Sequence, residues 1–284
     1  MKKSNHRRQY PLLLMLPFVL LVAGFELGPL LAMIKGSFLS DDGGRVTLEQ
    51  YVTVFQSKYY VQGIRNSVMI SLFSAGISIV VALFAAYSIT RYSGKTRDRL
   101  LMIANMTSNF EGIPLSFSYI ILLGNNGLFT MLFARWGWDV LAGFNLYSWT
   151  GLVLVYVYFQ IPLAMLLVYP AFYGIQKEWR EAASLLGATS FHFWRHIGVP
   201  VLLPSAAGTF SILFANAMGA YATAYALVGS NYNLISLQIA SLVASDVALR
   251  PNLGSALGVL LASIMIATML LNERLLRQWR RDLR

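Results

Sequence analysis

Few side chains in this sequence have the types and spacing that catalysis or metal binding requires. The chain contains no cysteine, which excludes disulfides, thiolate metal sites and thiol chemistry. His192 and His196 are four residues apart, but no HExxH pattern surrounds them. We interpret them as polar residues at an interface. The sequence therefore predicts no catalytic residue and no metal site.

A second chemical pattern is the segment SGKT around Lys95, which resembles part of a phosphate-binding loop. Such a loop needs a glycine five residues before its Gly-Lys pair, where this chain has Ile89. We therefore expect no nucleotide or other cofactor on this chain. If ATP drives the protein, a partner binds it.

Two carboxylates interrupt long apolar segments: Glu111 in TSNFEGIPLSF and Glu26 in AGFELGP. A charge inside a bilayer costs about 2.5–3.5 kcal/mol on insertion scales, so it usually marks a pathway or a buried partner. Gly112 and Pro114 follow Glu111, and we expect the helix to kink or loosen there and to free backbone carbonyls. Glu111 and Asn109 are therefore candidates for a substrate path. The alternative is a structural hydrogen bond to a neighbouring helix, and for Glu26 a place at a subunit or lipid interface.

These residues lie in an apolar scaffold. The 284 residues are 57% hydrophobic and 12% charged, whereas soluble domains carry about 25% charged residues, so a bilayer is the expected solvent. A spanning helix needs about 20 mostly apolar residues. We predict an all-α polytopic membrane protein that forms a single transmembrane domain over 1–284. Its six spans are expected at about 12–34, 66–90, 100–124, 147–170, 201–228 and 255–273.

Charge predicts the orientation of these spans. The first span exceeds the 7–15 residues of a signal-peptide core, so we expect it to be retained. If the N-terminus is inside, the inner segments hold most of the 22 lysines and arginines. Both termini are therefore predicted to be cytoplasmic. The net charge of +10 then reflects topology and contact with anionic lipid rather than nucleic-acid binding.

The longest predicted cytoplasmic loop, 171–200, contains EWREAASLLGATSFHFWRHIGVP. We expect a helix over 178–186, because its acidic residues suit the positive end of the helix dipole and its alanines favour helix. Gly187 is a plausible C-terminal cap, and a second helical piece should follow over 190–196. Pro200 then marks the start of span five. An amphipathic loop that merely ties two spans is the alternative.

Part of this loop, EAASLLGATSFHFWRHIGVP, resembles the EAA loop of binding-protein-dependent ABC importer permeases. The family pattern is E-A-A, three residues, G-A, five residues, an aromatic that is usually Phe, two residues, I, two residues and P. Trp194 stands at the aromatic position, a departure that keeps an apolar side chain. The matching residues are Glu181, Ala182, Ala183, Gly187, Ala188, Ile197 and Pro200.

The resemblance implies a type I ABC importer permease fold. The loop would be a coupling helix in the groove of an ATPase subunit, and changes at Glu181 or Gly187 should uncouple ATP hydrolysis from transport. The implied partners are two ABC ATPases that bind ATP and Mg, a second permease subunit and a periplasmic or surface substrate-binding protein. A heterodimer is favoured over a homodimer. The implied location is a bacterial plasma membrane, with the Gram-negative inner membrane as the more common setting.

In the resembled family, span five lines the pathway near the two-fold axis. Asn216, Tyr221 and Tyr225 are therefore path candidates, with helix packing as the alternative. A carboxylate and tyrosines suit a small organic cation, and NFEGIPLSFSYIILLG resembles polyamine-type members. Other solutes (phosphonate, ferric iron, thiamine or a sugar) are alternatives. A secondary transporter with Glu111 as a proton site and an assembly subunit are rival functions.

Overall fold

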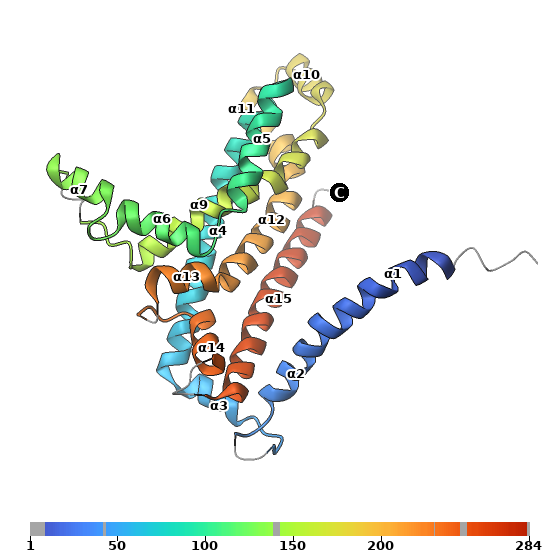
Figure 1. Ribbon diagram of the computed structural model, residues 1–284. Coiled ribbons are helices and arrows are strands. Elements are labelled where there is room, and N and C mark those ends of the chain that lie inside the picture. Colours follow the sequence, from blue (N-terminus) through green and yellow to red (C-terminus); the bar gives the residue numbers. More distant parts are fainter. Residues whose placement is uncertain (1–8, 42–43, 139–142, 230, 245–248, 283–284) are drawn as a thin grey trace, which may run out of the picture. The chain divides into compact units, whose positions relative to one another are not determined.

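The computed structural model describes residues 9–41, 44–138, 143–229, 231–244 and 249–282 (Figure 1). Residues 1–8 of the predicted basic N-terminal segment and Arg284 lie outside this part. β-structure in the described part consists of one isolated antiparallel bridge between Leu39 and Val46. The described helices long and apolar enough to cross a membrane are Met15–Ser37, Lys58–Thr90, Ile113–Arg135, Trp149–Gly174, Ser190–Gly219 and Pro251–Gln278. The all-α class and the number of candidate spans, six, are confirmed for the described residues, although some of the predicted bounds differ.

The chain divides into two compact units, and the first comprises residues 1–61 and 238–262. Within this unit a Cβ on Gly258 would lie 2.7 Å from the Met33 sulfur, so the missing side chain lets two helices approach closely. Arg250 donates to Asp41 over 2.9 Å. Its helices are α1 (Gln9–Val22), α2 (Gly28–Ser37) and α3 (Glu49–Gln56), with parts of α4 (Lys58–Thr90), α14 (Ile235–Ala244) and α15 (Pro251–Asp282).

The second unit comprises residues 62–237 and 263–284 and is built around α9 (Trp149–Val168). This helix lies in the candidate span with the largest buried share, 61%. Phe159 of α9 belongs to a core that also takes Ile70 from α4 and Leu115 from α6. The other helices that complete this unit are α5 (Gly94–Ser108), α6 (Ile113–Leu123), α7 (Leu128–Arg135), α10 (Lys177–Leu185), α11 (Ser190–Phe193), α12 (Val199–Gly219) and α13 (Tyr221–Val228).

A buried glutamine joins three helices of the second unit. Gln160 of α9 donates from Nε2 to the Leu213 carbonyl of α12 over 3.0 Å. Its Oε1 accepts from the Ser78 hydroxyl of α4 over 3.3 Å. Gln160 and Ser78 are both fully buried. Because unsatisfied polar groups are costly where no water can reach them, these bonds hold α4, α9 and α12 together.

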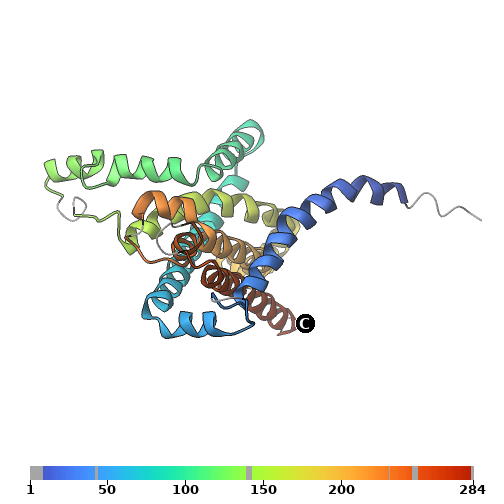
Figure 2. The same ribbon diagram turned by 60° about the horizontal axis from the view of Figure 1, so that its bottom comes forward.

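The predicted third span, 100–124, is not one helix. α5 ends at Ser108, and α6 begins only at Ile113. Gly112 between them has φ +78°, a left-handed conformation that glycine adopts readily. Pro114 lies in the first turn of α6, where its missing N–H costs nothing. The candidate span is therefore 113–135, and α6 and α7 extend to one side of the unit (Figure 1 and Figure 2).

The predicted boundary at Pro200 is also different. We expected a separate helical piece over 190–196, but α11 continues through a π-helical turn, Trp194–Gly198, into α12. The Val199 N–H bonds to the Trp194 carbonyl, one residue further back than in an α-helix. This wider turn accommodates Pro200, which has no N–H to donate. The result is a single helical segment over 190–219 that joins the loop to the fifth span.

Candidate functional site

The two-helix loop predicted from the sequence is present, and its turn is well defined. Gly187 has φ +79° and donates its N–H to the Ser184 carbonyl over 3.0 Å, while Ala188 donates to the Ala183 carbonyl over 2.9 Å. These two bonds form the Schellman motif that ends many helices at a glycine. The Thr189 hydroxyl then accepts from the His192 N–H and caps α11. Gly187 and Ala188 of the motif thus make a tight, hydrogen-bonded corner.

The exposed surface of this corner carries acidic and small residues of the motif together with two leucines. Glu181 and Ala182 are exposed, and Ala183 is half-buried. Leu185 and Leu186 are 89% and 88% exposed, although they lie in the segment that separates two candidate spans. Large apolar side chains grouped on a surface mark a site for a partner.

The sequence analysis did not single out Leu185 and Leu186. Their exposure could have been predicted from the sequence, because both leucines directly precede the glycine turn at the end of a short polar helix. A leucine pair at that place has few neighbours within its own helix to cover it. Both residues belong with the motif's exposed face as candidate contact residues.

The base of the loop is anchored by aromatic contacts. Trp194 meets Tyr87 of α4 edge to face, with ring centroids 5.1 Å apart. The indole also lies over Gly198, where a Cβ would come within 2.3 Å of the ring. Phe193 beside it is buried, while Ile197 and Pro200 are half-buried. The motif's aromatic position therefore fixes the loop to α4, and Gly198, which the sequence analysis missed, makes room for it.

A second group of candidates forms where two broken helices meet. The Gly112 N–H, at the start of α6, donates to the Thr223 hydroxyl of α13 over 3.0 Å. The Ser116 hydroxyl donates to the Thr223 carbonyl over 2.8 Å. α13 is separated from α12 at Ala220, whose ψ is 60° and whose carbonyl accepts from the Tyr156 hydroxyl over 3.2 Å. The predicted fifth span, 201–228, is thus two helices, and its second helix packs on α6.

This meeting point brings some of the predicted path residues together. Glu111 directly precedes Gly112 and is exposed, and within the described residues its carboxylate forms no hydrogen bond or ion pair. Tyr221 and Tyr225 begin α13, with their rings stacked at 5.5 Å. Asn109 instead donates to the carbonyl of Asn105 in its own helix.

Asn216 lies near the end of α12. It is half-buried on α12, one turn before the break at Ala220. The structure therefore associates Glu111 with the start of α13, where the two tyrosines lie.

Most of this chain matches a known family of transport proteins. Residues 78–281 match the family described as "Binding-protein-dependent transport system inner membrane component". The chain belongs to this family. The matched range covers both the loop and the α6–α13 contact, so both lie in the part of the chain that these transport components share.

Relatives within this group of transport components differ in their named solutes. The chain is 26% identical over 227 residues to the Escherichia coli K12 thiamine transport system permease protein ThiP, covering 80% of this chain and 42% of that protein. It thus spans less than half the length of that relative. It is 24% identical over 242 residues to the E. coli K12 spermidine/putrescine permease protein PotC, covering 84% of this chain and 85% of that one.

A solved structure shares the fold of this inner membrane component. It is a bacterial ABC transporter involved in the import of alginate, with a TM-score of 0.75 and 17% sequence identity over 96% of each chain. At this identity the likeness concerns the fold alone.

The described residues contain no group of three or more His, Asp or Glu side chains that could hold a metal ion. The rings of His192 and His196 stack at 4.1 Å, and His196 Nδ1 lies 3.0 Å from the His192 carbonyl oxygen. The pair is thus arranged along one helix face with a backbone partner.

Proposed function

We propose that this chain is a permease subunit of an ATP-driven importer. It forms half of the translocation path for a small solute that a substrate-binding protein delivers. The observation that carries this proposal is the exposed apolar corner formed by Leu185 and Leu186 on the rigid loop at residues 177–198. Family membership supports it, because the family is named for dependence on a binding protein.

The loop has the properties of a lever. α10 is closed by the Schellman motif at Gly187, and Trp194 holds the loop against Tyr87 of α4. The following helix continues to Gly219 and stops beside the α6–α13 contact. A force on α10 can therefore reach Ala220 through the hydrogen-bonded turn at Gly187 and the helical segment over 190–219. In this proposal a partner ATPase, with its own ATP and Mg, supplies the force, and this chain performs no catalysis.

The proposed assembly contains two ABC ATPases and a second permease subunit, with a related permease favoured over a second copy of this chain. Both termini and the loop face the cytoplasm in this assembly, because most basic residues then lie inside. The proposed location is the plasma membrane of a bacterium, with the Gram-negative inner membrane favoured. Glu181, Ala182 and Gly187 are the proposed contacts to the ATPase.

For the solute we propose a small organic cation. Glu111 offers an unpaired carboxylate beside α13, and Tyr221 and Tyr225 offer aromatic faces, which attract cations. Two relatives are named for thiamine and for spermidine or putrescine, all of which are organic cations. In this proposal the partner substrate-binding protein supplies most of the specificity for the solute.

Co-purification tests the proposed function. The tagged chain is expressed with the ATPase and permease encoded beside it, solubilised, and captured. We expect an ATPase to be recovered with it. Proteoliposomes of the complex, supplied with the substrate-binding protein on the opposite side, should take up solute only when ATP is present on the side of the membrane that holds the ATPase. Solute uptake by the chain without any ATPase would overturn the proposal in favour of a secondary transporter.

A further inference from the structure

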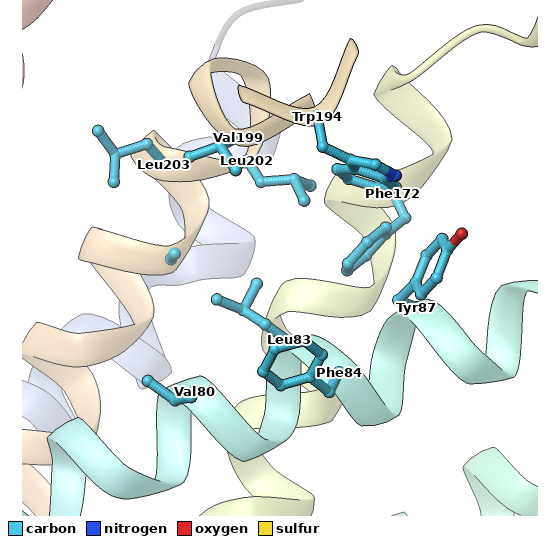
Figure 3. Close-up of a pocket in the computed structure, with 10 residues that line it drawn as sticks. Val80, Leu83, Phe84, Tyr87, Phe172, Trp194, Val199, Leu202 and Leu203 are labelled. Carbon is cyan, nitrogen blue, oxygen red and sulfur yellow. The ribbon is translucent and has the colours of Figure 1, made fainter. Parts of the chain in front are cut away.

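An apolar pocket of about 440 Å³ opens between α4 and α12 in the second unit, a volume within the range of about 300–1,000 Å³ that ligand sites occupy. Val80 and Phe84 line it from α4, and Leu203 and Ala206 line it from α12 (Figure 3). Phe84 is 71% exposed, so the pocket is open to its surroundings. Its lining offers hydrocarbon and aromatic groups, which suit an acyl chain.

A polar recess adjoins one end of this apolar pocket. Tyr87, Phe172 and Trp194 close the apolar pocket and also line a neighbouring recess of about 430 Å³. The Tyr87 hydroxyl accepts from Arg91 over 2.7 Å, and the Arg91 guanidinium lies 4.8 Å from the Tyr87 ring centroid. The two cavities thus share a wall of three aromatic rings.

The recess is predominantly cationic. Its charged lining residues are Arg97, Lys177, Arg180 and Glu178, and Arg91 adds a further charge at its edge. Arg97 donates to the Tyr173 hydroxyl over 3.2 Å and to Asp98 over 3.2 Å. The hydrogen bond to Asp98 raises the pKa of Arg97, so that guanidinium stays charged. Glu178 and Asp98 leave an excess of positive charge.

The ends of the candidate spans place the recess where a membrane interface is expected. Candidate spans end at Thr90 and Gly174, and another begins at Ser190; these three ends surround the recess. The apolar pocket extends from there along α4 and α12, into the spans. The polarity of the combined site therefore follows the polarity of a bilayer leaflet, with charge at the surface and hydrocarbon below.

We propose that this combined site binds one anionic phospholipid. An acyl chain lies between α4 and α12, and the phosphate lies beside Arg91 and Arg97. Basic pockets between membrane helices bind anionic headgroups in this way. The bound lipid contacts Trp194 and α10, so it supports the base of the loop. Occupancy by lipid is independent of the solute and does not rest on the proposed importer role.

Native mass spectrometry of the delipidated, purified chain tests this proposal. Palmitoyl-oleoyl phosphatidylglycerol and the matching phosphatidylcholine are titrated separately, with free glycerol phosphate as the competitor that lacks acyl chains. We expect phosphatidylglycerol to bind at least about tenfold more tightly, and the double variant R91Q/R97Q to lose about fivefold in affinity for each charge removed. Ala206→Phe, which fills the apolar pocket, should weaken both lipids.

Arg274→Gln is the matched control, because it removes an exposed guanidinium from α15, outside the cavity lining. It should leave lipid binding unchanged, and all variants should keep the thermal transition of the parent. Equal binding of the two lipids, or unchanged binding by R91Q/R97Q, would overturn the proposal. Full competition by glycerol phosphate would indicate a soluble anion instead. Loss of ATPase capture by R91Q/R97Q with unchanged lipid binding would indicate a protein contact.

Discussion

The indole ring of Trp194 lies over the backbone of Gly198, four residues further along the same helical segment. A Cβ at Gly198 would come within 2.3 Å of the ring, and Tyr87 holds the ring from another side. Gly198→Ala is therefore expected to displace Trp194 from α4. Overpacking of this kind costs about 1–3 kcal/mol, and it should lower the Tm of the purified chain in a thermal scan followed by tryptophan fluorescence.

Gly208→Ala is the control for this substitution. Gly208 lies on the same helix, and a Cβ there would meet nothing within 4 Å. Because alanine favours helix over glycine by up to about 1 kcal/mol, this variant should keep or slightly raise the Tm. An equal decrease in both variants would show that the loss arises from the helix and not from the Trp194 contact.

Leu185 and Leu186 should contribute a large share of ATPase binding. The double variant L185D/L186D places two charges where the proposal requires apolar contact. Central interface residues of this kind cost about 2 kcal/mol or more when lost, which corresponds to about thirtyfold weaker binding. The measurement is capture of the partner ATPase by the tagged chain, quantified against ATPase concentration.

Tyr92→Asp is a suitable comparison, because Tyr92 is also exposed but lies on the turn after α4. It should capture the ATPase as the parent does. Because Leu185 and Leu186 have little contact within the chain, the double variant should keep its Tm. Full capture by a folded L185D/L186D would remove the main support for the lever.

The sequence was sufficient for the number of spans and for the two-helix loop, because both depend on local patterns. Apolar runs of about 20 residues identify spans, and a glycine after an alanine-rich helix indicates its C-terminal cap. The break before α6 also had a local signal in Gly112 and Pro114. The displacement of the candidate span to 113–135 also depends on α7. That helix lies between the predicted spans 100–124 and 147–170, where no helix was expected.

The break at Ala220 had a weaker signal, a single glycine at position 219 with no proline beside it. Alanine is the best helix former, and the residues around it read as one continuous span. The conformation at Ala220 is associated with the Tyr156 hydroxyl of α9, which bonds to its carbonyl. The continuity through Pro200 was missed for the opposite reason, since proline usually marks a helix boundary. The π-helical turn that accommodates it was not apparent from residue types.

The bond between Gly112 and Thr223 should stabilise the contact between α6 and α13. Thr223→Val keeps the shape of the side chain and removes the acceptor for the Gly112 N–H. An unsatisfied buried group costs about 1–3 kcal/mol, so the Tm should fall and protease cleavage near Gly112 should become faster. Limited proteolysis with peptide mapping detects the site of this opening.

Thr268→Val provides the comparison for that variant. The Thr268 hydroxyl donates to the carbonyl of Ile264 in its own helix, so its loss affects no contact between helices. Cleavage near Gly112 should remain at the parental rate. If Thr223→Val behaves like Thr268→Val in both measurements, the hydroxyl bond is not what holds α6 against α13.

Glu111 should affect solute uptake without affecting assembly. Glu111→Gln keeps the size of the side chain but removes the charge that a cation would meet beside α13. Loss of a charged hydrogen bond of about 1.5–3 kcal/mol should lower uptake efficiency by about ten- to a hundredfold. Uptake of labelled putrescine or thiamine by proteoliposomes of the complex measures it, with ATPase capture measured in parallel. Glu273→Gln is the control, because that exposed carboxylate pairs with Arg277 within α15 and should leave uptake unchanged. Parental uptake by Glu111→Gln would instead assign Glu111 to packing or to the lipid surface, since a cation path through this contact requires its charge.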